Sequence, residues 1–94
     1  MTVRARFMGS LRSLSGKELL TLKLLKPLPL KQVILKIADE TPKLKEVFDG
    51  SQQAKLGSSI LILVNGKEIS VLEGLETTIK KDDELVFVPV LHGG

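Results

Sequence analysis

The chain has 94 residues, of which 43% are hydrophobic, so it can form one small domain with a core, and a second domain is excluded. It has no cysteine, which excludes a disulfide, a thiolate metal site and a cysteine nucleophile. The net charge is +3, but the chain has no tryptophan or tyrosine on which bases could stack, and we expect no direct nucleic-acid binding.

Two strands are expected at the N-terminal end. Hydrophobic and other residues alternate over residues 2–8 and again over residues 18–24, which is the pattern of a half-buried strand. Residues 11–16 are interpreted as the turn between them. The two strands are therefore predicted to form a hairpin.

A helix is expected next, because hydrophobic residues recur at helical spacing over residues 30–38. Thr41 followed by Pro42 is typical of an N-cap with proline at the first helical position. The sequence thus predicts a second, short helical segment that ends near Gly50. Residues 51–59 are polar and are expected to form a loop.

Three strands are expected in the C-terminal half. Residues 60–64 are aliphatic on both faces, which indicates an interior strand. Asn65 and Gly66 are the favoured pair for a tight hairpin turn, and they should lead into a strand over residues 67–71. The last strand is expected over residues 85–88.

This order of elements indicates an α+β fold, with a mixed sheet of about five strands and one main helix across one face. We place the domain at residues 1–88 and a flexible C-terminal tail at residues 89–94. Pro89 cannot donate to a strand ladder and should help to end the pairing.

The residues of the chain do not form a catalytic set. The only histidine is His92, close to the end of the sequence, and the glycines are scattered singly rather than in a phosphate-binding loop. Adjacent carboxylates at Asp82, Asp83 and Glu84 are interpreted as a solvated turn. We therefore expect no enzyme activity, no bound metal and no bound cofactor. No apolar run approaches the length of a membrane span, so we expect a cytoplasmic protein without a membrane partner.

The two closing glycines, Gly93 and Gly94, carry the functional hypothesis. Glycine has no β-carbon and fits a narrow channel, so an extended tail of this kind can enter the catalytic site of another protein. A C-terminal carboxylate is ionised at neutral pH and reacts only after an oxygen is replaced by a leaving group such as AMP. The sequence thus predicts a partner enzyme that uses ATP.

Several motifs resemble a known family. The segment from Phe7 to Gly16, the residues 63–67 and the residues 79–90 resemble the small subunit of molybdopterin synthase. The closing residues Leu91, His92, Gly93 and Gly94 are more similar to the ubiquitin-related modifier that serves tRNA thiolation and protein conjugation. The resemblance spans nearly the whole chain.

The resemblance implies a β-grasp, ubiquitin-like fold in which Gly94 is adenylated by a ubiquitin-activating-type enzyme and converted to a thiocarboxylate by a sulfur donor system. Leu91, His92 and Gly93 would then form the tail that enters the partner. By position, the resemblance also implies an apolar patch for that partner, made of Met8, Val86 and Val88. The alternative interpretation is that these three are sheet residues partly covered by their neighbours.

Three functions remain open. The first is a ubiquitin-like sulfur carrier, activated at Gly94, that serves tRNA thiolation, conjugation to lysines of target proteins, or both. The second is the small subunit of molybdopterin synthase, bound to its large catalytic subunit. The third is a β-grasp interaction module whose terminus plays no part. By default we expect a monomer that does not self-associate.

Overall fold

The computed structural model describes residues 1–48 and 60–90. The predicted loop over residues 51–59 and the tail residues Leu91, His92, Gly93 and Gly94 lie outside the described residues. Twelve elements follow one another along the described parts: β1 (Thr2–Phe7), α1 (Gly9–Ser15), β2 (Leu19–Lys23), β3 (Leu28–Pro29), α2 (Leu30–Glu40), η1 (Pro42–Leu44), β4 (Ile60–Val64), β5 (Lys67–Glu68), η3 (Ile69–Val71), η4 (Gly74–Glu76), β6 (Thr78–Ile79) and β7 (Glu84–Pro89).

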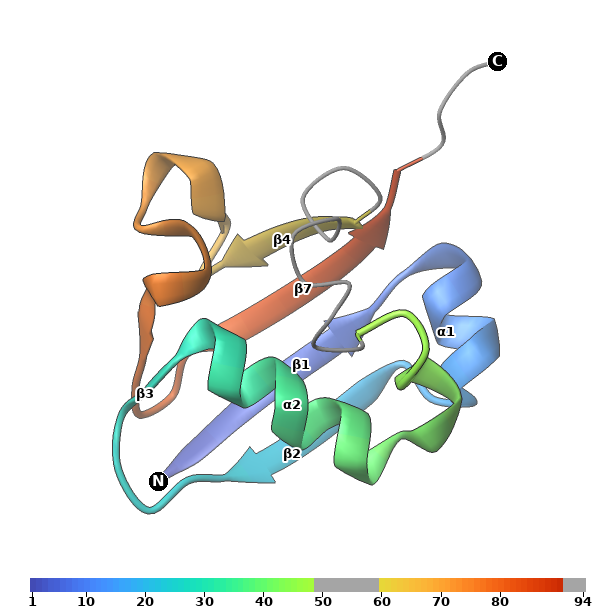
Figure 1. Cartoon of the computed structure of the whole chain (residues 1–94), viewed down its shortest axis with the longest axis horizontal. Helices are drawn as coiled ribbons and strands as arrows, with labels where there is room; N and C mark the ends of the chain where they lie inside the picture. Colours follow the sequence, from blue (N-terminus) through green and yellow to red (C-terminus); the bar gives the residue numbers. More distant parts are fainter. Residues whose placement is uncertain (49–59, 91–94) are drawn as a thin grey trace.

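The predicted α+β architecture is confirmed. Five strands form one mixed sheet in the order β2, β1, β7, β4, β5, and α2 lies across one face of it (Figure 1). The central strands β1 and β7 pair in parallel, whereas β2, β4 and β5 pair antiparallel with their neighbours. A small separate pair, β3 with β6, closes one end of the domain.

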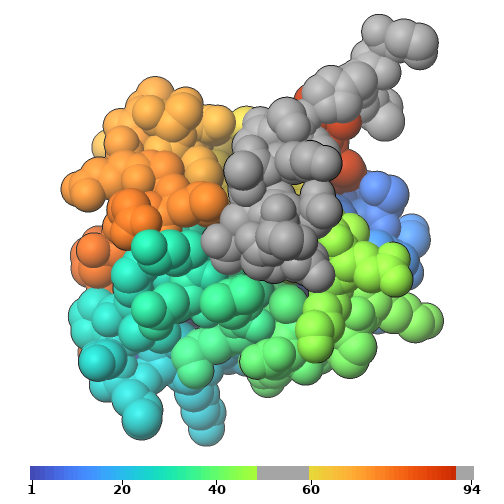
Figure 2. Space-filling model, viewed as in Figure 1, coloured from blue at the N-terminus to red at the C-terminus, as the bar shows by residue number. Residues whose placement is uncertain are grey.

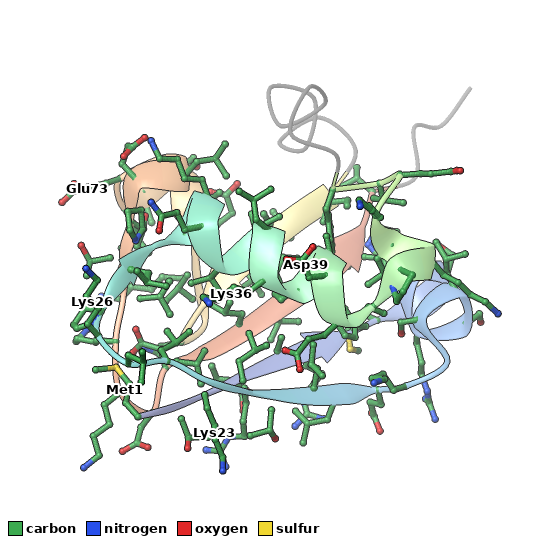
Figure 3. All side chains as sticks on the ribbon, turned by 60° about the horizontal axis from the view of Figure 1, so that its bottom comes forward. Met1, Lys23, Lys26, Lys36, Asp39 and Glu73 are labelled. Carbon is green, nitrogen blue, oxygen red and sulfur yellow. The ribbon has the colours of Figure 1, made fainter. Side chains whose placement is uncertain are left out.

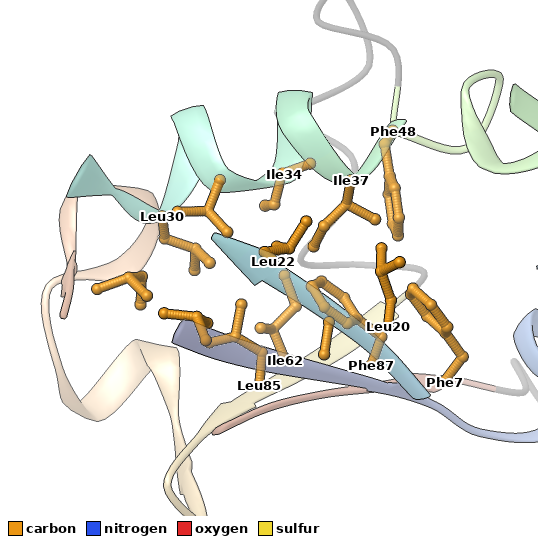
Figure 4. Close-up of a cluster of buried hydrophobic side chains, with 14 of the residues drawn as sticks. Phe7, Leu20, Leu22, Leu30, Ile34, Ile37, Phe48, Ile62, Leu85 and Phe87 are labelled. Carbon is orange, nitrogen blue, oxygen red and sulfur yellow. The ribbon is translucent and has the colours of Figure 1, made fainter. Parts of the chain in front are cut away.

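The helix α2 forms because its apolar residues fall on one face, which the sheet covers. All five positions of that stripe are buried: Leu30, Val33, Ile34, Ile37 and Ala38. Beneath them lie the inward side chains of the strands (Figure 4). The core includes three phenylalanines, Phe7, Phe48 and Phe87, whose ring centroids lie 5.8 Å (Phe7 to Phe87) and 5.4 Å (Phe48 to Phe87) apart. Phe7 and Phe87 therefore face inward, as expected from alternation.

The segment predicted as a turn after β1 is instead a helix, α1. Only Leu11 of this helix is buried, so the sequence shows no apolar stripe, and its glycine and serine content is typical of turns. Its C-terminal end is formed by Gly16 at φ +76°, whose N–H donates to the Arg12 carbonyl oxygen at 3.0 Å. This left-handed glycine is a common way for a helix to end.

Two further predictions need correction. The strand expected over residues 67–71 is only two residues long, because the chain turns into η3 after Glu68, whose carboxylate accepts the N–H of Ser70. The short helical segment after α2 is present as η1, with Pro42 at its start, but the hydroxyl of Thr41 makes no capping hydrogen bond. The hairpin turn is confirmed, since Asn65 and Gly66 both have positive φ, 51° and 85°.

Candidate functional site

The face of the sheet away from α2 carries an apolar surface. Along β7, Leu85 and Phe87 are fully buried under the helix, so Val86 and Val88 point to the opposite side, where both are half-buried. Met8 continues the extended chain beyond β1 and is 40% exposed. Its N–H donates to the carbonyl oxygen of Phe87 at 3.0 Å, which holds it beside the end of β7.

The predicted site residues Met8, Val86 and Val88 are therefore close together. The register of the parallel pair sets Phe7 opposite Phe87, so Met8 lies next to Val88 on the open face. Whether a partner binds these three residues stays a prediction.

Two residues that sequence reasoning missed complete this surface. The register of β4 with β7 pairs Leu63 with Val86 and Leu61 with Val88, and both leucines are half-buried on the open face. The signal was present, because a strand with apolar residues on both faces must place one set away from the core. We call Met8, Leu61, Leu63, Val86 and Val88 the open-face patch.

Charged side chains border the open-face patch on the β1 side. Arg6 pairs with Val86 in the ladder, and its guanidinium lies 3.7 Å from the Glu18 carboxylate. Two residues earlier in each strand, Arg4 pairs with Glu84. An apolar centre with a charged rim is the arrangement found in surfaces that bind other proteins.

The end of β7 is held by a close contact with the start of α1. Gly9 has φ +53°, and a β-carbon on it would lie 3.0 Å from Cγ of Pro89. Only glycine therefore fits here without displacing Pro89. Pro89 is the last residue of β7, so this contact fixes the end of the strand that precedes residues 90–94.

The carboxylates interpreted as a solvated turn behave differently from one another. Asp83 is only 4% exposed, and its carboxylate accepts the side-chain N–H of Asn65 at 2.9 Å and the backbone N–H of Lys80 at 2.8 Å. Asp82 is exposed, at φ +65°. The prediction was wrong for Asp83, which serves as an internal link between the β4–β5 turn and the start of β7.

The described residues hold little that is chemically reactive. Within residues 1–48 and 60–90, no group of three or more histidine, cysteine, aspartate or glutamate side chains is placed to hold a metal ion. The pKa of the half-buried Glu68 is lowered by hydrogen bonds from the Ser70 side chain and backbone. In the same part of the chain, no helix is long and apolar enough to cross a membrane.

Comparisons with known proteins give a family match and several relatives. The family model of Urm1, the ubiquitin related modifier, matches residues 2–94. The "Ubiquitin-related modifier 1" of Schizosaccharomyces pombe is 38% identical over 55 residues, which cover 58% of this chain and 55% of that protein. A "Putative sulfur carrier protein" of Archaeoglobus fulgidus is 40% identical over 43 residues, covering 46% and 49%. The matches span about half the length of these two curated relatives.

Solved structures resemble the whole chain. The small archaeal modifier protein 1 of Methanosarcina acetivorans is 36% identical, with a TM-score of 0.78, and 99% of this chain and 96% of that one are covered. A chain in the complex of subunits 1 and 2 of the molybdopterin-converting factor of Helicobacter pylori is 26% identical, with a TM-score of 0.60 and full coverage of both chains. The expected β-grasp, ubiquitin-like fold is confirmed. Three of these four relatives are named as a modifier or a sulfur carrier.

Proposed function

The chain belongs to the ubiquitin-related modifier family, and from this premise we propose that it is a ubiquitin-like sulfur carrier and protein modifier whose reactive group is the carboxylate of Gly94. The observation that carries the proposal is the match to the family, which extends through Gly93 and Gly94. The names of two relatives, a ubiquitin-related modifier and a putative sulfur carrier, support it.

The reaction takes place in partner enzymes. A ubiquitin-activating-type enzyme joins the Gly94 carboxylate to the AMP part of ATP and releases pyrophosphate. Sulfide from a sulfur donor system then displaces AMP and leaves a thiocarboxylate, or a thiol of the partner displaces AMP and passes the acyl group to a lysine amine as an isopeptide. The domain contributes binding and orientation, and the acceptors we propose are tRNA for the sulfur and target-protein lysines for the acyl group.

The open-face patch gives the domain a surface for the activating partner. Val86, Val88 and Met8 lie at the end of β7, next to the residues from which the tail departs. A partner bound on this surface would receive a chain whose starting direction is set by Gly9 against Pro89. Fixing that direction lowers the entropy that must be lost when Leu91, His92, Gly93 and Gly94 enter a catalytic channel.

A second candidate is the small subunit of molybdopterin synthase. The similarity to a chain in the complex of the two molybdopterin-converting factor subunits favours it, since that chain is matched over its full length. In this case the partner of the patch is a large catalytic subunit, and a pterin precursor receives the sulfur. Copurification with such a subunit from the source cells would distinguish this candidate from the first.

Intact mass spectrometry tests the shared chemistry. The protein is incubated with ATP, sulfide and each candidate activating enzyme, beside a variant lacking Gly94. We expect a gain of about 16 Da, the difference between sulfur and oxygen, in the intact protein alone. An unchanged mass with every activating enzyme would contradict the carrier function and leave the domain as an interaction module.

A further inference from the structure

The outer strand β2 has an unpaired backbone edge. Leu24 exchanges both hydrogen bonds with Met1, and the N–H of Phe7 donates to the Glu18 carbonyl oxygen at 2.8 Å. In an antiparallel ladder such pairs recur at every second residue. The N–H and C=O groups of Thr21 and Lys23 therefore point away from β1, and among the described residues nothing pairs with them.

A groove runs between this edge and α2. One part, of about 460 Å³, is lined by Thr21, Lys23, Lys36, Asp39 and Glu40. An adjoining hollow of about 250 Å³ shares Lys23 and Lys36 and extends toward the β2–β3 connection, where Lys26, Leu25 and Leu28 line it. Because the two hollows share Lys23 and Lys36, they lie next to each other along the free edge, and we call them together the groove. Figure 3 shows Lys36 and Asp39 on α2 above β2, Lys26 beyond the end of that strand, and the side chain of Lys23 on the other side of β2 from α2.

The two ends of the groove carry opposite charge. Lys26 and Lys36 lie at one end, and neither makes an ion pair within the described residues, whereas the side chain of Lys23 alternates with the buried Leu22 and points to the other face of the sheet. Asp39 and Glu40 lie at the other end, in the last turn of α2, where the helix dipole adds further negative potential.

Leu25 adds an apolar contact at the basic end, since its side chain is fully exposed (104%). The surface view shows atoms of the β2–β3 connection projecting beyond α2 at this rim (Figure 2). An extended chain lying here would meet lysines and a leucine at one end and carboxylates at the other.

We propose that the β2 edge and this groove bind an extended acidic segment of another protein as an additional strand of the sheet. Backbone bonds to Thr21 and Lys23 hold the segment, and acidic residues beside an aliphatic one occupy the end at Lys26 and Lys36. Antiparallel addition is the more stable arrangement, so the acidic residues come first in the bound segment and a basic residue near Asp39 comes last.

A titration followed by amide chemical shifts tests this in the full chain. The probe is a capped peptide of about eight residues that begins with two glutamates, continues with alternating valine and threonine, and ends in lysine. The control peptide has the same composition with the lysine first and the glutamates last. We expect shifts at Thr21, Lys23 and Lys36 with the probe, and weaker binding of the control.

Two sets of variants distinguish the contribution of the lysine charges to peptide binding from the contribution of backbone hydrogen bonds to β2. Lys26→Glu with Lys36→Glu should reverse the preference, so that the control peptide binds more tightly than the probe, with a change of about twofold to fivefold in affinity per lysine. Thr21→Pro removes an outward N–H without breaking a bond to β1, and should abolish binding, whereas Thr21→Val keeps that N–H and should leave binding unchanged. Amide spectra of the free variants show that each is folded.

Four results would overturn the proposal. The first is that the peptide changes amide chemical shifts only in the open-face patch, and the second is that both peptides bind equally. The third is that amide chemical shifts change with protein concentration when no peptide is present. The fourth is that an oligothymidylate binds more tightly than the probe at the same lysines. The third would indicate a second copy of the chain, and the fourth a nucleic acid. The proposal is independent of the tail, since a variant lacking Gly94 should bind the probe as the intact protein does.

Discussion

Gly9 lies so close to Pro89 that a β-carbon on Gly9 would stand 3.0 Å from the Cγ atom of Pro89. This contact joins the start of α1 to the last residue of β7, which precedes the proposed reactive tail. Because Gly9 also has φ +53°, an alanine here is strained and crowded at once.

Gly9→Ala should therefore slow activation at Gly94 on the order of tenfold and lower the free energy of unfolding by about 1 kcal/mol. The shift of Pro89 needed to accommodate the methyl group displaces the residue at the end of β7, just before the proposed reactive tail. Rates are followed by the 16 Da mass gain, and stability by urea unfolding.

Gly16→Ala is the matched control. Gly16 also has a left-handed φ, +76°, but nothing lies within 4 Å of its added β-carbon. It should lose similar stability, about 1 kcal/mol, with normal activation. If both variants slow activation equally, strain alone is responsible and the contact with Pro89 has no part in directing the tail.

If the activating enzyme binds the open-face patch, a charge placed in the patch should weaken that binding. Val86→Lys places a charge in the middle of the patch, between Arg6 and Leu63 in the ladders, without entering the core. We expect the KM for this protein in the activation reaction to rise on the order of tenfold, with little change in the unfolding midpoint.

The same change at Val71 is the control, since this valine is 73% exposed on η3 and lies outside the patch. Val71→Lys should leave KM unchanged. An equal rise in KM for both variants would indicate a general effect of added charge and not a docking surface.

Asp82 and Asp83 are adjacent, but replacing them should change the free energy of unfolding by different amounts. Asp83→Ala leaves the Lys80 N–H and the Asn65 side-chain N–H without their buried acceptor, and should lower the free energy of unfolding by about 1–3 kcal/mol. Asp82→Gly should change it by less than about 1 kcal/mol, because Asp82 is exposed and has φ +65°. Urea unfolding of both variants decides, and equal losses would contradict the role of Asp83 as an internal link.

Glu68 provides a pH dependence. Hydrogen bonds from Ser70, first from its side chain and then from its backbone, lower the pKa of this carboxyl in the folded chain. A lowered pKa means that ionised Glu68 stabilises the fold above its unfolded pKa, and that this contribution is lost as the pH falls through the folded pKa. Ser70→Ala should raise the pKa of Glu68, measured from its carboxyl carbon shift; an unchanged titration would contradict the assigned cause.

The parts of the fold that the sequence predicts well are those with a long periodic pattern. α2 buries five residues at helical spacing, and β1 alternates over six residues, so burial on one face determines their structure. α1 could not be predicted in this way because a single residue, Leu11, is buried. The same limit applies to β5, which ends where a local bond from Ser70 to Glu68 turns the chain.

The candidate site was predictable only in part, for a different reason. Alternation along β7 places Val86 and Val88 on the open face, but which strands flank β7 depends on pairings between distant segments. Leu61 and Leu63 enter the patch through that pairing. Asp83 was misassigned for the same reason, since its partner Asn65 is 18 residues away and no local pattern links them.

Removing the Thr41 hydroxyl should lower the free energy of unfolding if the sequence pattern is right, and raise it if the structure is right. The sequence Thr41-Pro42 is typical of an N-cap, in which the hydroxyl accepts a backbone N–H, and removing such a cap costs about 1 kcal/mol. In the structure the Thr41 hydroxyl is buried and has no hydrogen-bond partner among the described residues. Replacing an unpaired buried hydroxyl by a methyl group of the same shape removes a desolvation cost.

Thr41→Val should therefore raise the free energy of unfolding by about 1 kcal/mol. Thr77→Val is the control, because the Thr77 hydroxyl is paired: it accepts the N–H of Glu73 at 3.1 Å and donates to the Gly74 carbonyl oxygen at 2.7 Å. That variant should lose about 1–2 kcal/mol. Urea unfolding measures both, and a loss of stability in Thr41→Val would mean that the hydroxyl caps η1 in solution.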